Sequence, residues 1–130
     1  MAVIGIEEIF LKVKNMEAAI DFYHGILGIP LDKQDGERTY LQMDRGHLVL
    51  QIEHHTGRHQ GGGPLHFAMT VTEEEFDEIM AKFEGGFHFT RGPYGERGKG
   101  RAYFMMDPDG NESEINTRYL HGTPQRFDVV

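Results

Sequence analysis

The chain has 130 residues, of which 38% are apolar, 11% aromatic and 26% charged, a composition that excludes extensive disorder and predicts a packed core. Its 13 basic and 21 acidic residues give a net charge of -8, so it repels phosphate backbones and we expect no nucleic-acid partner. Cysteine is absent, which excludes disulfides, Cys-based zinc sites and thiol catalysis. No apolar run has the length of a membrane span, and we expect a cytoplasmic protein with no membrane partner.

The first half of the chain has an ordered series of strand and helix signals. Alternating apolar residues predict a strand over 6–13. An amphipathic helix follows, with Asn15 as its N-cap and Gly28 as its stop signal. Two further strands are predicted over 38–43 and 47–53.

The second half repeats this order. A strand over 65–71 precedes a helix with a Thr72–Glu75 capping box, and the helix ends at Gly85 and Gly86. Further strands are then expected, over residues 87–90, 101–106 and 112–117. The pattern in both halves is a strand, a helix and then a run of strands.

Direct sequence matches support an internal repeat. Residues 40–44 (Tyr-Leu-Gln-Met-Asp) match residues 103–107 (Tyr-Phe-Met-Met-Asp) at an offset of 63, and residues 8–13 match residues 66–71 at an offset of 58. The difference indicates an insertion, which we assign to a glycine-rich loop over 92–100. We therefore predict one domain over 1–130. It has one module at about 5–54, a linker at 55–64, a second module at about 65–118 and a tail at 119–130.

The linker contains three histidines together with consecutive glycines. A mobile loop does not hold a fixed coordination geometry cheaply, so we expect a solvated loop there and not a metal site.

Strand alternation selects a set of polar residues that face away from the helices. At repeat-equivalent positions of the strands these are Glu8, Gln51, His66 and Glu114. Two carboxylates and an imidazole that converge in a cleft require compensation, and a divalent cation supplies it. Alternation alone leaves Glu53 as a rival of Gln51, and Glu112 as a rival of Glu114.

Two segments resemble a known family. Residues 9–23 are similar to the opening strand and helix of the glyoxalase / bleomycin-resistance / extradiol-dioxygenase superfamily, the vicinal oxygen chelate proteins, and residues 107–115 (Asp-Pro-Asp-Gly-Asn-Glu-Ser-Glu-Ile) resemble its final hairpin. The resemblance extends to about Arg118. It implies an α+β fold of two paired βαβββ modules that form a cup-shaped mixed sheet, usually within a homodimer.

The resemblance also implies a ligand set for a divalent Zn, Ni, Mn, Co or Fe ion, namely Glu8, Gln51, His66 and Glu114. Many members have His at the position of Glu8 and Glu at the position of Gln51. This departure disfavours a ring-cleaving iron dioxygenase, which needs two His and one carboxylate. It leaves open a weak or vestigial site, because a neutral amide is a poor ligand.

The favoured function is a metal-dependent lyase or isomerase of the glyoxalase type, acting on a small substrate with two neighbouring oxygens. The resemblance implies that Glu114 is the proton-transfer base, with Glu8 as its partner carboxylate. Substrate contacts are expected from Phe10, Phe104, Met106 and Arg101. The alternative is a metal-free protein that sequesters a cationic drug, as bleomycin-resistance proteins do, and the negative net charge suits this.

Overall fold

The computed structural model describes residues 6–53, 66–86 and 88–121. The chain forms two compact units. The first comprises Met1–Gly63 with Asp107–Asn111, and the second comprises Pro64–Met106 with Glu112–Val130. The predicted linker and most of the predicted tail lie outside the described residues.

The first unit contains a four-stranded mixed sheet in the order β1-β4-β3-β2, in which β1 runs parallel to β4. Its elements are β1 (Glu8–Val13), α1 (Met16–Ile20), the π-helical segment η1 (Asp21–Ile26), β2 (Leu31–Asp35), β3 (Arg38–Gln42) and β4 (His47–Ile52). The predicted first helix is therefore continued by a π-helical segment. It begins as predicted, since the Asn15 side chain accepts a hydrogen bond from the Ala18 amide.

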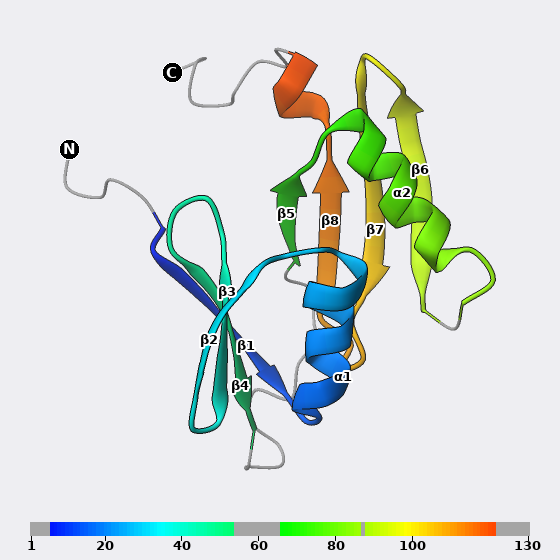
Figure 1. Cartoon of the computed structure of the whole chain (residues 1–130). Coiled ribbons are helices and arrows are strands. Elements are labelled where there is room, and N and C mark those ends of the chain that lie inside the picture. Colours follow the sequence, from blue (N-terminus) through cyan, green and yellow to red (C-terminus); the bar gives the residue numbers. More distant parts are fainter. Residues whose placement is uncertain (1–5, 54–65, 87, 122–130) are drawn as a thin grey trace. The chain divides into compact units, whose positions relative to one another are not determined.

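The second unit has the same strand order, β5-β8-β7-β6, with β5 parallel to β8. Its elements are β5 (His66–Thr70), α2 (Glu73–Phe83), β6 (Thr90–Glu96), β7 (Gly100–Met106), β8 (Glu112–Asn116) and the short 3₁₀ helix η2 (Arg118–His121) (Figure 1). Two βαβββ modules with one strand order confirm the α+β fold that the family resemblance implied.

Helix α2 covers one face of the second sheet (Figure 1). The ring of Tyr103 on β7 lies edge-on to Phe76, 6.3 Å between centroids, and it also contacts Phe83. The capping box predicted at the start of α2 is present, because Thr72 and Glu75 exchange side-chain and backbone hydrogen bonds. Helix packing therefore takes one face of the sheet and leaves the other for polar groups.

Two strands differ from the prediction. Strand β2 was not predicted, because all of its residues are exposed and its sequence shows no apolar alternation. Strand β6 was predicted only over 87–90, but it covers Thr90–Glu96 and so includes most of the segment assigned to a loop. Glycine is required at position 95 by tertiary contact, because a Cβ there would lie 2.2 Å from the carbonyl oxygen of Gly100.

A buried hydrogen bond fastens the Asp107–Asn111 turn inside the first unit. The hydroxyl of Tyr23 donates to Oδ2 of Asp107 at 2.7 Å. The amide of Lys14 donates to Oδ1 of Asp109 at 2.9 Å. Across the described ranges, no helix combines the length and the apolar character needed to cross a bilayer.

Candidate functional site

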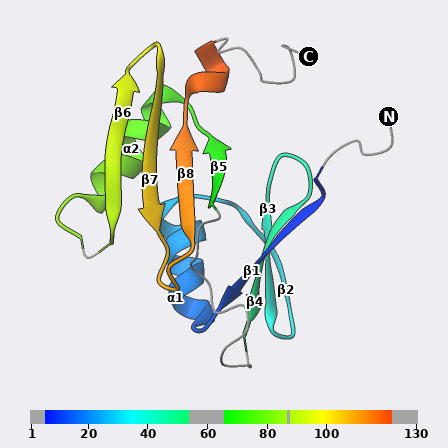
Figure 2. The same ribbon diagram turned by 180° about the vertical axis from the view of Figure 1, so that it is seen from behind.

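The candidate site lies on the face of the second sheet opposite α2. Figure 2 shows the sheet from this side, with α2 behind it. His66 is the first residue of β5, and the parallel register pairs it with Glu112 on β8. Its Nε2 lies 3.3 Å from Oε1 of Glu114, and its Nδ1 lies 3.7 Å from Oε1 of Glu112. One imidazole therefore lies between the carboxylate of Glu114 and that of its rival Glu112, on the strand face where alternation puts all three.

Glu114 is the buried member of this group, with only 3% of its surface exposed. Its second oxygen, Oε2, accepts a hydrogen bond from Nδ2 of Asn116. The same oxygen lies 3.4 Å from Nη2 of Arg118 at the start of η2. A carboxylate loses its hydration when buried, and these donors compensate for that loss.

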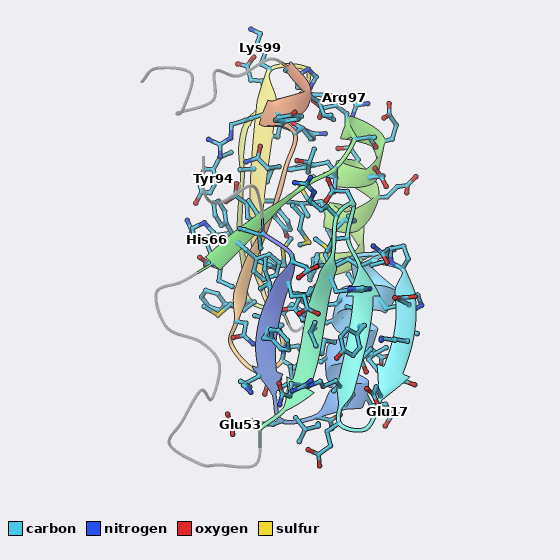
Figure 3. All side chains as sticks on the ribbon, turned by 90° about the vertical axis from the view of Figure 1, so that its left-hand side faces the viewer. Glu17, Glu53, His66, Tyr94, Arg97 and Lys99 are labelled. Atoms are coloured by element: carbon cyan, nitrogen blue, oxygen red, sulfur yellow. The ribbon has the colours of Figure 1, made fainter. Side chains whose placement is uncertain are left out.

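Cationic and aromatic groups surround the other carboxylate. Arg91 on β6 lies 3.4 Å from Oε1 of Glu112, and its guanidinium stacks 3.8 Å above the Phe104 ring. The hydrogen bond that Arg91 donates to Glu112, with a further one that it donates to Tyr94, raises the pKa of Arg91. Phe104 also contacts the His66 ring edge-on, and Figure 3 shows His66 and Tyr94 on the same side of these strands.

The His66–Glu114 geometry fits a shared divalent cation. Two donors bound to one metal at about 2.1 Å lie roughly 3.0–3.4 Å apart in octahedral or tetrahedral geometry. The 3.3 Å separation of His66 Nε2 and Glu114 Oε1 falls in this range. Imidazole and carboxylate are ligands that Zn, Mn, Ni, Co and Fe accept. Within the described part of the chain, however, no three or more His, Asp or Glu side chains are already arranged so that they could hold a metal ion together.

The first unit holds Glu8 and Gln51 on one face of its sheet, but not side by side. Glu8 pairs with His47 in the β1–β4 register, whereas Gln51 pairs with Lys12. The register therefore places Val49, and not Gln51, at the position that Glu114 occupies in the second unit. Glu8 is exposed, whereas Gln51 and its rival Glu53 are only partly exposed.

The register partner of Glu8 is a second imidazole. His47 Nε2 lies 2.8 Å from Oδ2 of Asp32 on β2, and the His47 ring meets Tyr40 edge-on. Each unit thus pairs one acid with one imidazole at the start of its parallel strands, Glu8 with His47 and His66 with Glu112. The two residue types are exchanged between the units.

The four expected substrate contacts have different surroundings. Phe104 lies beside His66, and Met106 follows it on the same face by alternation. Phe10 is 44% exposed in the first unit, with Arg38 over its ring. Arg101 faces the opposite way, because its guanidinium stacks on Phe76 of α2.

Arg101 is fully engaged with that helix. It donates to Oε1 of Glu73 through Nε at 2.9 Å and Nη2 at 2.7 Å, and to Oδ1 of Asp77 at 2.8 Å. Arg97 also pairs with Asp77, while Lys99 pairs with Glu96, at the hairpin end shown in Figure 3. These cations therefore belong to the α2 face and not to the face that carries His66.

Three residues in contact with Glu112 or Glu114 were not among the predicted ones: Arg91, Asn116 and Arg118. In the first unit, His47, the register partner of Glu8, was also not predicted. The sequence could have indicated Asn116, because it lies two positions after Glu114 and therefore on the same strand face. Arg91 was not indicated, because the sequence did not reveal that strand β6 begins at Thr90. His47 lies at a strand start whose register decides its neighbour, and register is a tertiary property.

Comparison with known proteins agrees with this description. The family model of the Glyoxalase/Bleomycin resistance protein/Dioxygenase superfamily matches residues 5–115. The glutathione transferase FosA of Serratia marcescens is 25% identical over 115 residues, which cover 85% of this chain and 78% of FosA.

Solved structures share the fold. The fosfomycin resistance protein FosX of Listeria monocytogenes, solved with Mn(II) and sulfate, has a TM-score of 0.74 at 17% identity and covers 96% of this chain and 98% of its own. A lactoylglutathione lyase of Agrobacterium tumefaciens has a TM-score of 0.68 at 22% identity and covers 94% and 99%. With its duplicated βαβββ modules and a family match over most of its length, this chain belongs to the Glyoxalase/Bleomycin resistance protein/Dioxygenase superfamily.

Proposed function

We propose that this chain is a metal-dependent lyase or isomerase of the glyoxalase type, acting on a small substrate that offers two neighbouring oxygens. The observation that carries the proposal is the 3.3 Å approach of His66 Nε2 to Glu114 Oε1, a separation suited to two ligands of one cation. Glu8 is the proposed third ligand, because it occupies the position of His66 in the first module. Gln51 is left out of the set, because the register separates it from Glu8.

A bound divalent cation supplies a Lewis acid for the substrate oxygens. In the proposed reaction the Glu114 carboxylate takes a proton from a substrate carbon and returns it to the neighbouring carbon, so no oxidant is needed. Glu8 is the partner carboxylate. Phe104, packed against the His66 ring, supplies an apolar wall that keeps water from this proton.

The test begins with chelator-treated protein, which is loaded with Mn²⁺, Ni²⁺ or Zn²⁺ and assayed with the hemithioacetal of methylglyoxal and glutathione. We expect turnover that needs the metal, and a loss of about 10²–10⁴-fold in Glu114→Gln, the range for removal of a general base. Glu74→Gln is the matched control, because the Glu74 side chain is 74% exposed on α2. Turnover that is unchanged in Glu114→Gln contradicts the assignment of the base.

A second candidate is a glutathione transferase that acts on a small anionic electrophile. Two arginines favour it, since Arg91 and Arg118 flank Glu112 and Glu114 on the same sheet face, and each is about half exposed. The similarity to a curated glutathione transferase supports the same reading. Guanidinium groups bind phosphonate or carboxylate oxygens in pairs, which suits an anionic substrate.

Fosfomycin with glutathione and Mn²⁺ is the probe for this second candidate. Formation of the thioether adduct in this mixture, with no turnover of the hemithioacetal, favours the transferase. Stoichiometric binding of bleomycin by metal-free protein favours the sequestration alternative. The homodimer and the cytoplasmic location stay predictions.

A further inference from the structure

We infer that Asn116 is a positioning residue that fixes the orientation of the Glu114 carboxylate, and this inference rests on the proposed function in which Glu114 is a metal ligand. Asn116 ends strand β8, two residues after Glu114 and on the same face. Its side chain is buried, with 9% of the residue's surface exposed. It touches no expected substrate group, so any effect it has on chemistry acts through Glu114.

Both ends of the Asn116 amide are in use. Nδ2 donates to Oε2 of Glu114. Oδ1 accepts from the backbone amide of Arg118 at 2.7 Å and from its Nε at 3.2 Å. A backbone donor holds Oδ1 in place, so the amide cannot turn over without losing that bond, and Nδ2 stays directed at Glu114.

This contact decides which oxygen of Glu114 faces His66. With Oε2 bound by Asn116 and approached by Arg118, the oxygen left to face Nε2 of His66 is Oε1, at 3.3 Å. Without the amide, rotation of the Glu114 side chain is opposed at Oε2 only by the long 3.4 Å contact with Arg118. Hydrogen-bond partners of metal ligands typically contribute 10- to 100-fold to metal affinity.

The contribution of Arg118 differs from that of Asn116. Its side chain is 57% exposed, and its contact with Glu114 is long at 3.4 Å, so solvent screens it. Its backbone amide, which Arg118→Ala leaves in place, provides the 2.7 Å bond to Asn116. We therefore expect Arg118→Ala to weaken metal binding much less than a change at Asn116.

The experiment compares the full chain carrying Asn116→Leu, a substitution of similar size, with the unmodified chain. Asn116→Ala is the second variant if the first does not fold. The control is Asn15→Ala, which removes the N-cap of α1 in the first unit and lowers stability without touching Glu114. Two quantities are measured: the Kd for Mn²⁺ by calorimetry, and the orientation of Glu114 in crystals of the metal-free proteins.

We expect the Kd for Mn²⁺ to rise 10- to 100-fold in Asn116→Leu, with Oε1 of Glu114 turned away from His66, and to change less than threefold in Asn15→Ala. An unmoved Glu114 carboxylate in the variant overturns the inference, whatever the Kd. If the unmodified chain binds no Mn²⁺, the proposed function fails, and the crystals of metal-free protein still decide whether Asn116 orients Glu114.

Discussion

Glu8 and Gln51 lie on the same face of the first sheet, yet the β1–β4 register sets them far apart. Glu8 pairs with His47, and Gln51 pairs with Lys12, four residues further along β1. At about 3.3 Å per residue this is a separation of roughly 13 Å along the strands. In the second unit the comparable offset between His66 and Glu114 is only two residues, and their side chains meet.

This register leads to a prediction about metal binding. Glu8→Ala should raise the Kd for Mn²⁺ at least 10-fold, because it removes a proposed ligand, whereas Gln51→Ala should change it less than threefold. Calorimetric titration of both variants checks this. A larger loss of Mn²⁺ affinity in Gln51→Ala than in Glu8→Ala would show that the repeat offset, and not the strand register, identifies the ligand.

A second prediction concerns Tyr23. Its hydroxyl is buried and donates to Asp107, so Tyr23→Phe should lower the free energy of unfolding at pH 7 by about 1–3 kcal/mol. Urea denaturation measures this difference. Tyr119→Phe is the control, because Tyr119 is 66% exposed and should lose little.

The pH dependence of the same pair has a defined sign. Burial first, and then the charge and hydrogen bond of Asp107, raise the pKa of Tyr23 in the folded protein. The unfolded chain therefore releases this proton near pH 10, and the folded protein releases it only at a higher pH. We expect the free energy of unfolding to decrease above about pH 10, and to decrease less steeply in Tyr23→Phe. Equal slopes for the two proteins would contradict the assignment.

A third prediction concerns acid stability. The hydrogen bond from the Gly98 amide, followed by those from Arg101 and His121, lowers the pKa of Glu73 to about 2. The stabilisation from this carboxylate is present above its unfolded pKa of about 4.3 and is lost as the pH falls through about 2. Glu73→Gln should flatten the decrease in the free energy of unfolding across that window. Glu74 is a largely exposed neighbour on α2, so Glu74→Gln should leave the decrease in the free energy of unfolding across that window unchanged.

A fourth prediction concerns a buried hydroxyl. Ser113 on β8 is 0% exposed, and its Oγ has no hydrogen-bond partner among the described residues. Replacing an unsatisfied buried polar group removes a desolvation penalty, so Ser113→Ala should raise the free energy of unfolding by about 1 kcal/mol. Thermal and urea denaturation both measure the change, and a destabilised variant would reveal a hydrogen bond to bound water.

Local signals in the sequence predicted elements correctly where the signals were strong. The Asn15 cap and the Thr72–Glu75 capping box are short-range features, so sequence spacing is enough to predict them. Strand β2 was missed, because an exposed strand shows no apolar alternation and is stabilised by pairing with β3. Strand β6 was misplaced because its glycines are needed for close contacts and not for a loop.

The sequence by itself determined the repeated order of a strand, a helix and a run of strands, and within each unit it determined the strand face that carries Glu8 or carries His66 and Glu114, since strand alternation has a fixed period of two. Only the tertiary structure decided which residues on that face are neighbours, because register depends on pairing between distant segments. It moved Gln51 away from Glu8, placed His47 opposite Glu8, and directed Arg101 towards the carboxylates of α2. It also placed Asn116 against Glu114, where the amide holds the carboxylate that faces His66.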